Sequence, residues 1–125
     1  MNEDEISSAV IGAAIEVHKT LGPGLLESIY QKCLAKELSL AGLVYREEVA
    51  LPLNYKGTNF EAAFRLDMLV ADKVILELKA VETILPVHEA QLLSYLRLTG
   101  YKLGLLINFN VPVLRSGVRR VVNKL

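Results

Sequence analysis

The sequence predicts one α/β domain, spanning residues 1–125, in which helices flank a mixed β-sheet. In the first 40 residues, apolar side chains recur every three or four positions, as in amphipathic helices. From Leu43 onward the chain changes to strand-like segments broken by short turns, and a further helical pattern and an apolar strand follow. The predicted order is therefore α-α-β-β-β-α-β. With 125 residues, about half of them apolar, the chain can bury a core.

Glycine and proline delimit the two N-terminal helices. The first has its apolar face between residues 6 and 21 and ends at Gly22-Pro23-Gly24. The second has its apolar face between residues 26 and 38 and ends near Gly42. Glu27 then lies in the first turn of the second helix, where a carboxylate favours the positive end of the helix dipole.

Four segments have the composition of strands, and a third helix lies between the last two. The strands are expected at residues 44–54, 60–70, 74–79 and 103–109. The first three form an antiparallel meander, because only Lys56-Gly57 and residues 71–73 clearly interrupt them. The third helix begins at Pro86 and is ended by Gly100. Residues 117–123 could add a short edge strand.

Composition excludes several classes of protein. Residues 1–5 carry acids where a signal peptide needs basic residues, and no apolar run reaches the ~20 residues that cross a bilayer. We therefore expect a cytoplasmic protein with no membrane segment. The single cysteine, Cys33, excludes an internal disulfide framework and fits a small buried side chain.

Charge gives little guidance about a partner. The formal net charge is zero, whereas nucleic-acid-binding proteins usually carry a basic surface. Six basic residues and no acidic residue lie between Arg97 and Leu125, but they could scatter over a solvated surface. His18 and His88 have no partner at metal-ligand spacing, and both are interpreted as surface residues.

The second and third strands bring a group of charged side chains together. Alternation places Glu77 and Lys79 on one face of their strand, about 7 Å apart. A three-residue loop at 71–73 places Asp67 opposite Glu77 and Arg65 opposite Lys79. The same register matches apolar residues on the other face: Val70 with Val74, Met68 with Leu76, and Leu66 with Leu78. A slip of one residue would move Asp67 to the apolar face.

Two directly opposed carboxylates repel each other, so some group should compensate. Mg²⁺ is commonly held by one or two carboxylates, waters and substrate phosphate. Such a cation would polarise a phosphoryl oxygen and help deprotonate a water, while Lys79 stabilised the developing phosphate charge or oriented that water. The alternative is a solvent-facing hairpin in which Asp67 and Glu77 are neutralised by Arg65 and Lys79.

Three motifs carry a family resemblance. Asp67, nine intervening residues and Glu77-Leu78-Lys79 resemble the motif of PD-(D/E)XK nucleases. Residues 24–30, Gly-Leu-Leu-Glu-Ser-Ile-Tyr, match the pattern that names the GxxExxY family, and Gln91 to Tyr95 resembles the QxxxY element of RecB-like nucleases. The chain is identified on these motifs as a member of the GxxExxY family of that superfamily, with its restriction-endonuclease-like mixed sheet. Leu66 stands where the motif has proline.

The resemblance implies a role for each matching residue. Asp67 and Glu77 would be metal ligands, with the Leu78 carbonyl as a third ligand and Glu27 approaching from the second helix. Lys79 would be the catalytic lysine. Gln91 would join the catalytic set and, with Tyr95, support the site or contact substrate. Glu27 also fits a purely helix-stabilising role, and Gln91 and Tyr95 could simply hydrogen-bond at a core edge. Tyr30 is the motif tyrosine, placed in site support, but its apolar stripe also fits core packing.

The implied function is hydrolysis of nucleic-acid phosphodiester bonds with Mg²⁺ or Mn²⁺. DNA is expected in preference to RNA. A homodimer is plausible, because many nucleases of this kind use two sites or build a basic channel across an interface. The alternative is a non-catalytic nucleic-acid-binding or protein-binding module that retains the nuclease fold, and the neutral net charge and the small size motivate it.

Overall fold

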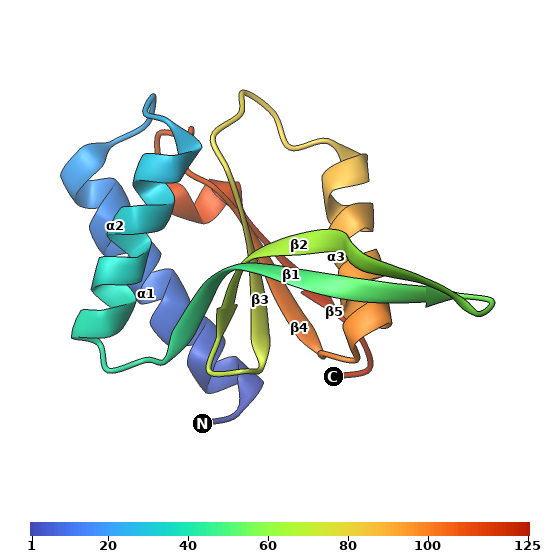
Figure 1. Cartoon of the computed structure of the whole chain (residues 1–125). Helices are drawn as coiled ribbons and strands as arrows, with labels where there is room; N and C mark the ends of the chain where they lie inside the picture. The colour runs from blue at the N-terminus through green and yellow to red at the C-terminus, as the bar shows by residue number, and fades with distance from the viewer.

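The computed structural model describes residues 1–125 as a five-stranded mixed sheet with helices on both faces (Figure 1). The elements are α1 (Glu3–Leu21), α2 (Glu27–Leu40), β1 (Tyr45–Tyr55), β2 (Thr58–Val70), β3 (Val74–Lys79), α3 (Pro86–Thr99), β4 (Leu103–Asn108), a 3₁₀ turn η1 (Leu114–Gly117) and β5 (Val118–Val122). The strands lie in sequence order, with β3 and β4 parallel and every other neighbouring pair antiparallel. The predicted fold class and element order are confirmed, including the short final strand.

Local sequence explains where the helices begin. Asn2 caps α1, since its side-chain oxygen accepts the Glu5 N–H at 2.8 Å and the Glu5 carboxylate accepts the Asn2 N–H at 2.9 Å. Pro86 opens α3 at a position where no backbone N–H is needed. None of the helices combines the length and the apolar composition needed to cross a membrane.

The two faces of the sheet bury separate cores. Helices α1 and α2 cover one face, where Val10 and Leu34 pack with Leu76 and Leu105 of the strands. Helix α3 covers the other face over a smaller core. That core contains Ile75, Leu92, Leu96 and Leu106, together with Val49, Leu66 and Leu69. The packing of α3 is close enough that a Cβ on Gly104 of β4 would lie 2.7 Å from the Leu92 side chain. The strand order and these two cores fix the face on which each strand residue lies.

The β1–β2 hairpin bends midway, and its distal half projects away from the sheet as an arm (Figure 1). The register of the pair shifts between Leu51 and Leu53, on either side of Pro52, which has no backbone N–H to donate. Most side chains of the arm are exposed, including Tyr55 and Phe60. Only the proximal half of the hairpin therefore contributes to the cores.

Two sequence-based expectations are wrong at Asp67, where the pairing of β2 with β3 ends. Leu66 was predicted to share a face with Met68, but it lies in the α3-side core while Met68 lies in the other core. The strict alternation of β2 is therefore broken at Asp67. Arg65 was predicted to oppose Lys79, but it is paired with Ala50 of β1 and lies 3.7 Å from the Glu48 carboxylate.

The interpretation of His18 as a surface residue was also wrong. His18 is 8% exposed, and its Nε2 lies 2.8 Å from the Val111 carbonyl oxygen. This contact ties the end of α1 to the segment after β4. His88 is half-buried, and its Nδ1 accepts the Leu85 N–H at 3.0 Å, so it helps to begin α3.

Candidate active site

The candidate site forms where β2 and β3 separate. Their backbone pairing runs from Val70 and Val74 to Met68 and Leu76, the register that the sequence predicted, and ends there. Beyond it, the Asp67 N–H donates to Glu77 Oε2 at 2.9 Å, and the Leu78 N–H donates to Asp67 Oδ2 at 2.8 Å. The two carboxylates thus replace ladder hydrogen bonds with bonds to each other's strand. Each is held in place through one oxygen.

Burial dominates the electrostatics of this pair. Glu77 is 5% exposed, and its burial, together with the charge of Asp67, raises its pKa from 4.5 to about 8 despite the hydrogen bond from Asp67 and the charge of Lys79. Burial also raises the pKa of Asp67, against the Leu78 N–H hydrogen bond that lowers it. A carboxylate whose charged form is disfavoured in this way is stabilised by an added cation.

Glu27 and Lys79 border the carboxylate pair from different elements. Glu27 is the first residue of α2, and Lys79 is the last residue of β3. The pKa of Glu27 is raised by burial and by the charge of Asp67, and it is lowered by Lys79, so the three groups share one electrostatic environment. The structure therefore brings the motif glutamate of the second helix into the electrostatic environment of the hairpin carboxylates.

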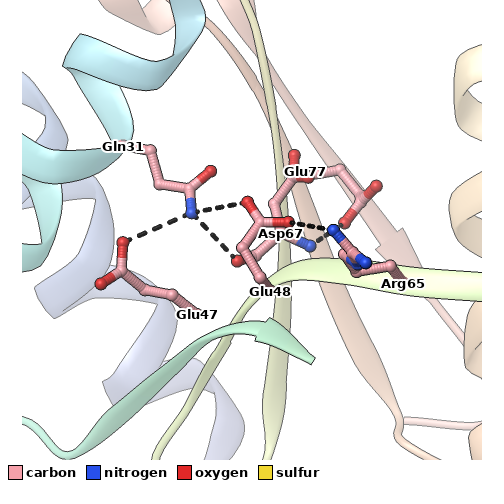
Figure 2. A network of polar contacts seen from close by, with 6 residues as sticks. All are labelled: Gln31, Glu47, Glu48, Arg65, Asp67 and Glu77. Carbon is pink, nitrogen blue, oxygen red and sulfur yellow. Dashed lines mark hydrogen bonds and ion pairs between the residues drawn. The ribbon is translucent and has the colours of Figure 1, made fainter. Parts of the chain in front are cut away.

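Gln31 of α2 and Glu48 of β1, which the sequence analysis did not select, lie beside Asp67. The Gln31 amide nitrogen donates to Glu48 Oε1 at 3.0 Å, to Glu47 Oε1 at 3.3 Å and to the Asp67 carbonyl at 3.4 Å (Figure 2). Gln31 is only 8% exposed. It lies one turn after Glu27, so the same face of α2 contributes both side chains. A helical spacing of four residues was the available signal for Gln31.

Glu48 lies across the hairpin from Asp67, because its neighbours Glu47 and Val49 pair with Met68 and Leu66. Its backbone has a φ of 51°, in the left-handed region that residues other than glycine rarely adopt. Its charge also raises the pKa of Asp67. Strained backbone of this kind clusters at functional sites. A sequence pattern that assumes regular strands gives no signal for such a conformation.

Helix α3 contributes Tyr95 to the other side of the site. Burial raises the pKa of the Tyr95 hydroxyl, and the charges of Glu77 and Asp67 raise it further, so this hydroxyl lies within the electrostatic influence of the carboxylates. The ring stacks on Phe64 of β2, with centroids 4.8 Å apart. Gln91, one turn earlier, is exposed, and its side chain forms no hydrogen bond within the protein. The structure thus places Tyr95 beside the carboxylates and leaves the Gln91 amide free.

Tyr30 lies inside the protein rather than on a substrate surface. It is fully buried, and its ring stacks on Phe109 with centroids 4.5 Å apart. Its hydroxyl donates to the Gly22 carbonyl at 2.6 Å and accepts the Leu25 N–H at 3.1 Å. These bonds fix the loop that leads into α2 and therefore the position from which Glu27 extends. Any support that Tyr30 gives to the site is indirect.

The donor set fits a hard divalent cation. Asp67 and Glu77 are adjacent carboxylates with one oxygen each left unbonded by the backbone, and the Leu78 peptide, whose carbonyl is the third candidate ligand, adjoins both. Mg²⁺ binds through one or two carboxylates and retains waters for the remaining positions. No three His, Cys, Asp or Glu side chains converge closely enough to form a complete metal cage as they stand.

An α/β fold with two carboxylates and a lysine at the end of one hairpin is that of a restriction-endonuclease-like protein. The chain matches the family model described as "PD-(D/E)XK nuclease superfamily" over residues 4–121, and it belongs to that superfamily. Proteins of this superfamily are typically nucleases that use divalent metal ions.

The fold is also found among solved structures. A structure titled "Crystal structure of SSO0001" is similar with a TM-score of 0.58 and 21% sequence identity, over 79% of this chain and 51% of that chain. This likeness shows the fold alone, and the present chain spans about half the length of that protein. A comparison with curated proteins gave no match.

Proposed function

We propose that this protein is a metal-dependent nuclease in which Asp67 and Glu77 bind Mg²⁺ or Mn²⁺, with the Leu78 carbonyl as the third protein ligand. The observation that carries the proposal is the interlocked carboxylate pair, held at 2.9 and 2.8 Å by the backbone of the opposite strand, with Lys79 beside it. A bound divalent cation supplies charge that polarises a phosphoryl oxygen and lowers the pKa of a water.

Side chains around the metal site stabilise charge and bind water and substrate. The Lys79 ammonium, whose charge reaches Asp67, Glu77 and Glu27, stabilises negative charge that develops on the phosphate. Glu27 carries a raised pKa and accepts hydrogen bonds from water on the α2 side. On the α3 side, we propose that Tyr95 and the Gln91 amide donate hydrogen bonds to substrate.

The proposed branch of the superfamily, the preferred substrate and the oligomeric state rest on the sequence motifs. Gly24, Glu27 and Tyr30 support a place in the GxxExxY branch of the superfamily. DNA is the substrate we propose ahead of RNA, and a homodimer would extend a nucleic-acid surface that a chain of 125 residues provides only in part. Light scattering at assay concentration tests the dimer, and a monomer under those conditions would remove it.

Cleavage assays test the function directly. Labelled single-stranded DNA, double-stranded DNA and RNA are incubated with wild-type protein and Mg²⁺, Mn²⁺ or a chelator. Lys79→Ala should lower kcat by about 100-fold or more while the protein still binds metal, because only charge stabilisation is lost. Asp67→Asn should weaken metal binding itself. Lys73→Ala is the matched control, since Lys73 lies in the turn at the opposite end of β3 and binds the Met1 carbonyl.

Two results would contradict the proposal. One is a wild-type protein that leaves all three substrates intact with either metal. The other is cleavage that survives Lys79→Ala unchanged, because a contaminating nuclease would then account for it. Nucleic-acid binding with no metal binding that depends on Asp67 and Glu77 would instead favour a non-catalytic binding module with a nuclease fold.

A further inference from the structure

A second polar feature lies at the carboxyl end of the parallel strands β3 and β4. It is a cavity of about 180 Å³ lined by Thr83, Asn108, Ser116 and Arg119, with Glu82 at its wall. Asn108 is the cross-strand partner of Lys79, so the cavity begins one strand away from the proposed catalytic lysine. In open α/β sheets, ligands bind outside the carboxyl ends of the strands.

The walls of this cavity are held rigidly. Asn108 is 2% exposed; its amide nitrogen donates to the Val81 carbonyl at 2.8 Å, and its amide oxygen accepts the Val81 N–H at 3.0 Å. These bonds tie the segment after β3 to the end of β4. On the other side, a Cβ on Gly117 would lie 2.2 Å from the Asn108 carbonyl oxygen, so only glycine allows η1 to approach this closely. The cavity is therefore part of the fold and not a gap between mobile loops.

Arg119 lies on the same face of the sheet as Glu77. Glu77 pairs with Leu106 of β4, and Leu106 pairs with Arg119 of β5, so the three residues form one cross-strand row. With neighbouring strands about 4.8 Å apart, the Cα atoms of Glu77 and Arg119 are about 10 Å apart. Arg120 points to the opposite face, where it forms an ion pair with Asp4 of α1.

The guanidinium of Arg119 is anchored but not neutralised. Its Nη1 donates to the carbonyls of Ser116 at 3.0 Å and Val118 at 3.2 Å, and it forms no ion pair with a carboxylate. A guanidinium has five N–H donors, so several remain for a ligand, and it matches the geometry of phosphate oxygens. Among the basic residues near the C-terminus, Arg119 is the one that combines the active-site face with a cavity.

We propose that this cavity is a subsite for a phosphodiester group of the nucleic-acid backbone, one that neighbours the phosphodiester being cut, with Arg119 as its main contact. The proposal rests on the proposed function in taking nucleic acid as the substrate. A backbone phosphate bound here would set the register of the strand relative to Asp67, Glu77 and Lys79 without reading its sequence. Glu82 opposes this attraction, so Glu82→Gln should tighten binding.

Binding measured without cleavage tests the subsite. Fluorescence anisotropy of labelled oligonucleotides of several sequences is recorded in chelator over a series of salt concentrations. Arg119→Gln should weaken binding roughly tenfold, as expected when a charged hydrogen-bond partner is lost. The loss should be similar for every sequence, and the salt slope should fall by about 1. Arg120→Gln is the matched control and should change neither quantity, and Arg119→Lys should keep the salt slope.

The outcomes separate this proposal from the nuclease activity. If Arg119→Gln and Arg120→Gln bind alike, or if no oligonucleotide binds, the subsite is refuted, whether or not cleavage occurs. If Arg119→Gln alone loses affinity and salt slope, the subsite stands, even for a protein that cuts nothing. In an active protein, Arg119→Gln should raise KM and leave kcat nearly unchanged, because the lost contact contributes equally to ground-state and transition-state binding.

Discussion

Glu77 should make the metal-free protein less stable as pH rises. Its side chain is 5% exposed, and burial together with the Asp67 charge raises its pKa from 4.5 to about 8. Between those two pH values the folded protein retains a proton that the unfolded chain has lost. The free energy of unfolding therefore falls with increasing pH in this window, by about 1.4 kcal/mol per pH unit. The full loss has an upper limit of about 5 kcal/mol, large against the ~5 to 15 kcal/mol of a typical domain.

Glu77→Gln should remove this dependence. The amide has nearly the same shape, its oxygen can still accept the Asp67 N–H, and it carries no charge at any pH. We expect the variant and the wild type to have similar stability near pH 5, and the variant to be more stable by several kcal/mol at pH 8.5. Urea unfolding in chelator, followed by circular dichroism from pH 5 to 9, measures the difference.

Controls make the measurement decisive. Glu61→Gln, at an exposed position in the β1–β2 arm, should follow the wild-type curve throughout. Mg²⁺ or Mn²⁺ should stabilise the wild type more than Glu77→Gln, and binding near pH 7 should release close to one proton, because the cation needs the charged carboxylate. Calorimetry in two buffers of different ionisation enthalpy counts that proton. Parallel pH curves for wild type and Glu77→Gln would refute the assignment of the raised pKa to Glu77.

Two further predictions concern the residues that position the acidic groups. Tyr30→Phe removes two hydrogen bonds of the loop before α2. The free energy of unfolding, measured in thermal or urea melts, should therefore fall by about 1 to 3 kcal/mol. An unchanged value would mean that the hydroxyl does not hold Gly22 and Leu25. Gln31→Ala leaves Glu47 and Glu48 without their shared donor and should lower the free energy of unfolding by a similar amount. In the control variant Gln91→Ala, at an exposed position, the free energy of unfolding should change by no more than about 0.5 kcal/mol. Equal effects would show that the Gln31 contacts are not formed.

Local patterns were sufficient to predict most of the fold. The periodicity of apolar residues and the glycines that end the helices predicted the order of helices and strands, and the three-residue turn predicted the register of β2 and β3. These features depend on residues close in sequence, so a single sequence contains them. The positions of Asp67 and Glu77 relative to each other follow from the same register. The prediction that Leu66 shares a sheet face with Met68 was wrong, because β2 bends where its pairing with β3 ends.

The remaining features of the site depend on contacts between distant elements. Gln31 of α2 reaches Glu48 of β1 only because α2 packs over that end of the sheet, and the positive φ of Glu48 arises inside a strand that the sequence predicts as regular. The cavity beside Arg119 likewise needs η1 to lie against Asn108. Apart from the four-residue spacing that puts Gln31 on the same helix face as Glu27, no periodicity within one segment records such contacts. Glu48, Gln31 and Arg119 were therefore found from the structure alone.

The spacing of the nuclease motif has a structural explanation in this hairpin. The nine residues between Asp67 and Glu77 are three that pair in β2, three in the turn and three that pair in β3. Pairing thus ends one residue before each carboxylate, and each carboxylate then takes a backbone N–H of the opposite strand. A shorter or longer turn would move one carboxylate to the opposite face or out of reach of that N–H. The two carboxylates interlock because the ladder stops there, and under our proposal the cation binds to the oxygen that each carboxylate leaves unbonded.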